Sequence, residues 1–80
     1  MKESPETRIF KNAWFERFAR QNKLTDQELR EAVTRAEKGL IDADLGGGVI
    51  KQRIARQGQG KSGGYRSIII FRSADKAFFV

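Results

Sequence analysis

The sequence predicts a single α+β domain, in which two N-terminal helices pack on a small antiparallel β-sheet. Apolar residues recur at helical spacing in the first half of the chain and alternate with a period of two in the second half. The charge is divided in the same way. Residues 1–44 hold nine basic and nine acidic residues, whereas residues 45–80 hold seven basic and one acidic. The net charge of +6 therefore falls on the predicted sheet and favours a polyanionic partner, nucleic acid first.

The first predicted helix covers residues 8–22, where Phe10, Trp14 and Phe18 recur at a spacing of four. We expect these aromatic side chains to fill the core, because so small a domain needs its large apolar residues inside. A groove for a partner protein is the alternative. A short strand over residues 7–10 is also possible, because the apolar residues there suit either conformation.

The second predicted helix has a clear start and a clear stop. Thr25 and Glu28 have the spacing of a capping box, in which each side chain binds the backbone of the other residue. Gly39 supplies the expected left-handed stop, and Leu40 can fold back on the last turn.

The second half of the chain predicts strands. Residues 41–48 are expected to form a connector that ends in three glycines. Strands are then expected over residues 49–55 and 65–71, and another begins at residue 77 after a turn. The strand over residues 65–71 is apolar on both faces near its end, which predicts a central position in the sheet.

Three cations form the candidate site. Lys51 and Arg53 project from the same face of one predicted strand, and Arg66 begins the next. Antiparallel pairing of these strands could bring all three to one face, where they repel one another unless an anion lies between them. Solvation, or pairing with helix carboxylates, is the alternative. Tyr65 beside this cluster could stack on a base, donate a proton or simply pack.

Several functional classes are excluded by composition and spacing. The run GQGKS at residues 58–62 lacks the earlier glycine and the following helix of a nucleotide-binding phosphate loop, so Lys61 is expected in a flexible hairpin loop. The chain has no cysteine and no histidine, and we expect no metal and no other cofactor. No apolar run approaches the roughly 20 residues that span a bilayer, and the polar N-terminus is unlike a signal peptide. We therefore expect a cytoplasmic protein.

The segment VIKQRIARQGQGKSGGYRSIIIF, at residues 49–71, resembles the RelE/HigB family of type II toxin–antitoxin toxins, most closely its HigB-like branch. In that branch a basic strand leads into a glycine-rich loop with a lysine and then into an apolar strand that begins with arginine. The resemblance implies one toxin domain over residues 1–80, with two helices on an antiparallel sheet. The family's strand after Val80 and its C-terminal helix have no counterpart, which implies a missing C-terminal segment.

The resemblance also implies a ribosome-dependent mRNA endonuclease, with the ribosome, mRNA and a HigA-like helix-turn-helix antitoxin as partners. Lys51 and Arg53 match the family's paired basic residues, and Arg66 matches the arginine that contacts the scissile phosphate. Lys61 matches a loop lysine of the HigB-like branch. The residues that we expect to bind RNA around this centre are Arg56, Lys61 and Arg72.

The chemistry of RNA cleavage agrees with part of this assignment. Attack by the RNA's own 2′-hydroxyl needs a base, an acid and stabilisation of the charged phosphorane. A lysine can serve as the base where neighbouring cations favour its neutral form, and Lys51 has such a neighbour in Arg53. Arg66 suits the developing charge through bidentate hydrogen bonds, and Tyr65 is a candidate acid. Two alternatives remain: a toxin-like fragment that binds RNA or antitoxin without cutting, and a ParE-type inhibitor of DNA gyrase.

Overall fold

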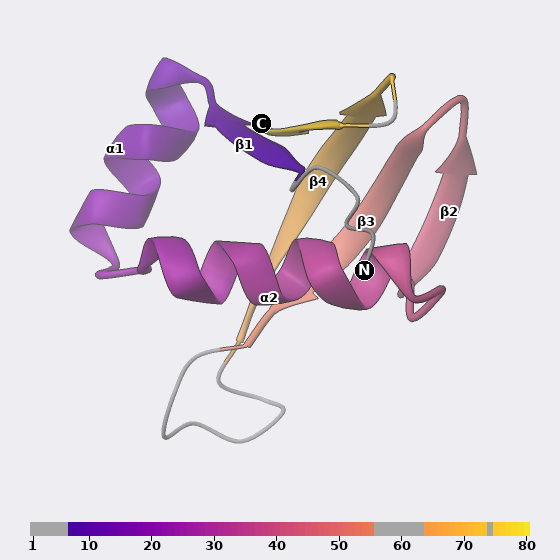
Figure 1. Ribbon diagram of the computed structural model, residues 1–80. Coiled ribbons are helices and arrows are strands. Elements are labelled where there is room, and N and C mark those ends of the chain that lie inside the picture. Colours follow the sequence, from indigo (N-terminus) through magenta and orange to yellow (C-terminus); the bar gives the residue numbers. More distant parts are fainter. Residues whose placement is uncertain (1–6, 56–63, 74) are drawn as a thin grey trace, which may run out of the picture.

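The computed structural model describes residues 7–55, 64–73 and 75–80. Its elements, in chain order, are β1 (Arg8–Lys11), α1 (Ala13–Gln21), α2 (Asp26–Glu37), β2 (Ala43–Gly46), β3 (Val49–Ile54), β4 (Tyr65–Arg72) and β5 (Lys76–Phe79). The strands form one sheet in the order β1-β5-β4-β3-β2, in which β1 pairs in parallel with β5 and the other neighbours are antiparallel. Figure 1 shows α2 crossing β3 and β4. The predicted α+β class is confirmed, with one parallel edge strand. No helix of the described ranges is long and apolar enough to cross a membrane.

Helix α2 begins and ends as the sequence predicts. Thr25 Oγ1 accepts the Glu28 N–H at 3.1 Å, and a Glu28 carboxylate oxygen accepts the Thr25 N–H at 2.9 Å. At the other end, Gly39 has φ of +86° and Leu40 N–H donates to the Arg35 carbonyl at 2.9 Å. The capping box is therefore confirmed, and the C-terminal turn is a Schellman motif.

Helix α1 is shorter than the helix predicted for residues 8–22. Residues 8–11 form β1, so the alternative of a short strand before the helix is confirmed. The helix begins after Asn12, whose side-chain oxygen accepts the Phe15 N–H at 2.7 Å. This cap sets the start of α1 and therefore which of its residues face the sheet.

The expectation that the aromatic stripe fills the core is wrong. Phe10 is 37% exposed and Trp14 is 57% exposed, while Phe18 is only partly buried. The buried aromatic residue of α1 is Phe15, at 1% exposure. Phe10 lies in a strand instead of the helix, so the spacing of four does not describe one helical face.

The connector predicted for residues 41–48 contains a strand, β2, which pairs with β3. Gly47 and Gly48 have φ of +64° and +84°, which suits the tight turn between these two strands. The sequence did not predict β2, because aspartate and glycine are depleted in strands.

Alternation divides β3 and β4 into two faces, as predicted. Their buried residues face the helices: Ile50, Gln52, Ile54, Ser67 and Ile69. Gln52 connects this face to α2, because its amide nitrogen donates to the carbonyls of Ala32 at 3.1 Å and Leu40 at 2.9 Å. Its oxygen accepts the Asp42 N–H at 3.1 Å. This buried side chain is fully hydrogen-bonded and holds the helix, the connector and the sheet together.

Candidate nucleic-acid interface

The register of β3 and β4 places the three predicted cations on one face of the sheet. Arg53 lies directly opposite Arg66, and Lys51 lies opposite Ile68. All three belong to the face away from the buried residues of β3 and β4, which we call the open face. Side chains directly opposite on antiparallel strands have Cβ atoms about 4.5–5.5 Å apart. The structure therefore gathers Lys51, Arg53 and Arg66 into one cluster.

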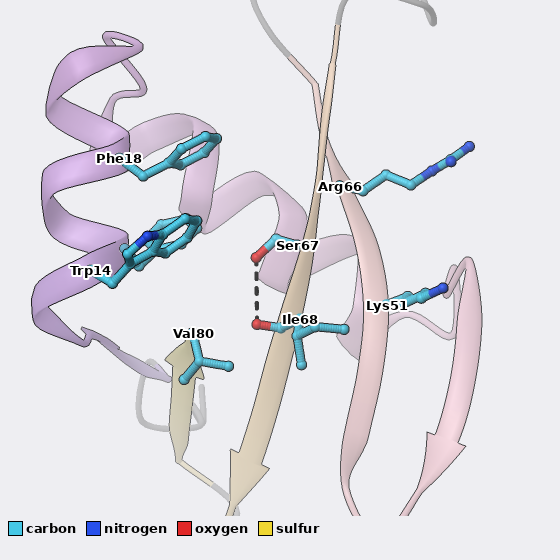
Figure 2. Close-up of a pocket in the computed structure, with 8 residues that line it drawn as sticks. Trp14, Phe18, Lys51, Arg66, Ser67, Ile68 and Val80 are labelled. Carbon is cyan, nitrogen blue, oxygen red and sulfur yellow. Dashed lines mark hydrogen bonds between the residues drawn. The ribbon is translucent and has the colours of Figure 1, made fainter.

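A hollow of about 370 Å³ lies beside β4 and contacts both sides of the sheet. Figure 2 shows Trp14 and Phe18 of α1 on one side of β4, and Lys51 and Arg66 pointing away on the other. Ser67 lines the hollow, and its hydroxyl donates to the Ile68 carbonyl at 3.4 Å. The cations and the exposed helix aromatics thus belong to separate surfaces.

The charges of Lys51 and Arg66 are only weakly opposed. Within the described ranges, Lys51 and Arg66 are exposed and have no carboxylate within ion-pair distance. A smaller cavity of about 210 Å³ is lined by these two cations, Ala43 and Asp42. The Asp42 carboxylate accepts the Arg53 backbone N–H at 2.7 Å, so it already has a structural partner. The cluster can therefore bind an anion such as a phosphate group.

Gly64 makes room for Arg53. A Cβ atom at Gly64 would lie 2.7 Å from the Ile54 carbonyl oxygen, 3.0 Å from Arg53 Cγ and 3.2 Å from Arg53 Cδ. The arginine stem therefore runs across the position that any larger residue would fill. The Arg53 carbonyl accepts a hydrogen bond from the Arg35 guanidinium of α2, which ties this part of β3 to the helix layer.

Tyr65 does not join the cluster. Its hydroxyl donates to Asn22 Oδ1 at 3.0 Å, and its ring meets Phe18 edge-on with centroids 5.4 Å apart. Neighbouring residues in a strand point to opposite faces, so Tyr65 faces the helices while Arg66 faces away. Its placement agrees with the packing alternative and separates it from the three cations.

Of the three residues predicted to bind RNA, the structure describes only Arg72. Arg72 is exposed on the open face at the far end of β4, opposite Lys76. Arg56 and Lys61 lie outside the described residues. No group of His, Cys, Asp or Glu side chains within the described ranges could hold a metal ion.

Sequence pattern missed one feature of the open face. Phe10 of β1 and Phe78 of β5 are paired in register, and their rings stack with centroids 4.9 Å apart. The available signal in the sequence was the doublet of Phe78 and Phe79. Adjacent residues in a strand point to opposite faces, so only one of these two rings can lie in the core.

These observations define a small α+β protein in which one face of the sheet is covered by helices and the other is cationic and partly apolar. A family model for the RelE toxin of the RelE/RelB toxin–antitoxin system matches residues 7–80. The chain belongs to this RelE toxin family, and it is therefore a toxin of a toxin–antitoxin system with an antitoxin as partner. A search of the curated proteins found no match.

Proposed function

We propose that this toxin is a ribosome-dependent mRNA endonuclease, and that Lys51, Arg53 and Arg66 form its phosphate site. The register that sets Arg53 opposite Arg66, with Lys51 on the same open face, is the observation that supports this most. Such a cluster attracts a polyanion, and its position on strands instead of a loop gives the three side chains a fixed relative geometry.

In the proposed reaction, the RNA 2′-oxygen attacks the adjacent phosphorus and its proton passes to the Lys51 amine, which acts as the general base. The bond from phosphorus to the 5′-oxygen breaks, leaving a cyclic phosphate and a 5′-hydroxyl. Arg66 stabilises the charge on the phosphorane through paired hydrogen bonds, with Arg53 beside it. Because Tyr65 faces the helices, we assign the proton taken up by the 5′-oxygen to water. The ribosome positions the mRNA and so supplies much of the rate.

The loop motif at residues 58–64 supports a narrower proposal, that this toxin is HigB-like and that its antitoxin is a HigA-like helix-turn-helix protein. Co-purification with antitoxins of the HigA and RelB types tests it. Binding only to a RelB-type antitoxin would contradict the narrower assignment and leave the family membership intact.

Arg66→Ala tests the endonuclease directly. At saturating ribosome its single-turnover cleavage rate should fall, because the activation free energy rises by about 2–4 kcal/mol when one fixed charge-stabilising donor is lost. Arg66→Lys should restore only part of it, because a point charge cannot reproduce the bidentate geometry. Arg17→Ala on α1 is the control, since Arg17 is exposed on the helix layer. A change in affinity with an unchanged saturated rate would make Arg66 a docking residue only.

A second candidate is a protein that binds RNA without cutting it. Within the described ranges, no histidine or tyrosine faces the same way as Lys51, which leaves the proposed reaction without a side-chain acid. Primer-extension mapping of mRNA after expression, run beside a DNA supercoiling assay, separates the possibilities. New 5′ ends support the endonuclease, ribosome binding without them supports the second candidate, and loss of supercoiling indicates a gyrase inhibitor.

A further inference from the structure

The open face carries a pair of stacked aromatic rings that the phosphate site does not use. Phe10 and Phe78 lie side by side on β1 and β5, with ring centroids 4.9 Å apart and ring planes 19° from parallel. Phe10 is 37% exposed, although its neighbour in sequence, Ile9, packs against the core. Folding alone does not explain a stacked pair on this side of the sheet, because the core is on the other.

The pair is the end of an apolar strip that crosses the sheet. Phe78 lies opposite Ile70 of β4, and Ile70 lies opposite Val49 of β3. Each strand contributes one half-exposed apolar side chain at this level. The strip runs from β1 to β3, perpendicular to the strands, and the half-buried Ile68, two residues from Ile70 on β4, extends it to the level of Lys51.

Cations border the strip. The Arg8 guanidinium lies 5.7 Å from the centre of the Phe10 ring. Arg72 and Lys76 are paired on β4 and β5 beyond Phe78. Asp75, the one acidic residue in the described residues 64–73 and 75–80, contacts both Arg8 at 3.7 Å and Lys76 at 3.3 Å. On the opposite side, the border is the cluster of Lys51, Arg53 and Arg66. An apolar centre with cations on both sides matches the alternation of bases and phosphates in a single strand of nucleic acid.

We propose that the Phe10–Phe78 pair is a stacking site for a base of single-stranded RNA whose backbone reaches the cluster of Lys51, Arg53 and Arg66. This inference rests on the proposed RNA substrate and adds to it a base-binding position. From β1 to β3 there are three strand spacings, about 14 Å, which is within reach of the shortest single-strand sites of about four nucleotides. Stacking tolerates any base, so the site positions RNA without selecting a sequence.

The test measures binding of fluorescently labelled hexaadenylate to the full chain by anisotropy at several salt concentrations. Phe10→Leu and Phe78→Leu keep an apolar side chain but remove the ring, and each should weaken binding about tenfold. The slope of log affinity against log salt should stay the same for both, because no phosphate contact is lost. Arg66→Ala should instead reduce that slope by about one unit.

Trp14→Leu is the matched control, since Trp14 is an exposed aromatic residue on the other side of β4 (Figure 2). It should bind hexaadenylate like the parent chain. Phe10→Tyr keeps the ring and should also keep the affinity. Thermal melts of each variant report whether it is folded before its affinity is compared.

A second measurement isolates the ring–base contact. Hexaadenylate with one abasic position should bind the parent chain more weakly, and Phe10→Leu should bind the intact and abasic strands more nearly equally. This non-additivity is what a direct contact predicts. Equal losses on the abasic strand in both proteins would overturn the stacking site.

Two further results would also overturn the inference. The first result is that Phe10→Leu binds hexaadenylate as tightly as the parent chain does. The second result is that Phe10→Leu or Phe78→Leu loses affinity for the antitoxin but not for hexaadenylate, which would make the strip a contact surface for a protein. Either can occur while Arg66→Ala still slows mRNA cleavage, so the stacking site can fail with the endonuclease intact. Absence of cleavage by the parent chain is the separate failure of the proposed function.

Discussion

The two faces of the sheet differ although the same strands form both. On the helix side, Ile54, Ile69 and Phe79 are fully buried, and the buried polar Gln52 has every hydrogen bond it needs. On the open face, the residues one position away are cations and half-exposed apolar side chains. Adjacent residues of one strand therefore serve different purposes: one set stabilises the fold, and the other is available to a partner. This division predicts that neighbouring substitutions have very different consequences.

The largest difference is expected between Phe79 and Phe78. Phe79→Ala removes a fully buried ring and should lower the free energy of unfolding by about 3–5 kcal/mol. Phe78→Ala removes mainly its stacking on Phe10 and should cost about 1 kcal/mol. Urea denaturation of the two variants measures both values. Equal losses would show that the open face is packed as tightly as the core.

The next effect is expected at Gln52. Gln52→Leu leaves the carbonyls of Ala32 and Leu40 and the N–H of Asp42 without their partner, at a cost of about 2–3 kcal/mol. Lys51→Ala, one position away and exposed, should change stability by less than about 0.5 kcal/mol. Chemical denaturation of both variants checks this contrast, and a neutral Gln52→Leu would mean that water replaces the lost hydrogen bonds.

Gly64→Ala should cost about 2 kcal/mol, because the new Cβ meets the Ile54 backbone oxygen at 2.7 Å and the chain must shift. The shift should also displace Arg53 and weaken RNA binding. Gly39→Ala is a control with φ of +86° and nothing within 4 Å of the added atom, so only backbone strain of about 1 kcal/mol is expected. Thermal melts and anisotropy separate the two effects. If Gly64→Ala is destabilised but binds RNA as the parent chain does, this glycine does not position Arg53 for RNA binding.

The smallest effect on stability is expected at Arg66. Arg66→Ala should stay within about 0.5 kcal/mol of the parent chain. Since Arg66 lies opposite another cation, Arg53, any gain should be seen at low salt and vanish as salt screens the repulsion. Melting temperatures at a series of salt concentrations test this. A large loss at every salt concentration would show that Arg66 supports the fold.

The sequence predicted the features that depend on local chemistry. The start and stop of α2 follow from Thr25, Glu28 and Gly39, whose side chains or backbone angles act within a few residues. Alternation in β3 and β4 likewise assigned the cations to one face. The same rule separates Tyr65 from Arg66, because adjacent strand residues point apart, and it could have removed Tyr65 from the candidate site.

Features that depend on distant pairing could not be predicted in this way. β2 contains aspartate and glycine and becomes a strand because β3 lies beside it. The apolar pattern of residues 8–11 suits a helix or a strand equally, and pairing with β5 decides for the strand. The Phe10–Phe78 pair depends on that same parallel register, so the doublet of Phe78 and Phe79 indicates that one ring lies outside the core but not that it stacks on Phe10.

The parallel pairing of β1 with β5 also has a consequence for the order of synthesis. The first strand to leave the ribosome joins the sheet only through the last described one. Contacts between residues so far apart in sequence form slowly, whereas the hairpin of β2 and β3 and the turns of α2 need only nearby residues. A nascent chain can therefore build its helices and central strands early, but the surface shared by Phe10 and Phe78 is assembled only after β5 has emerged.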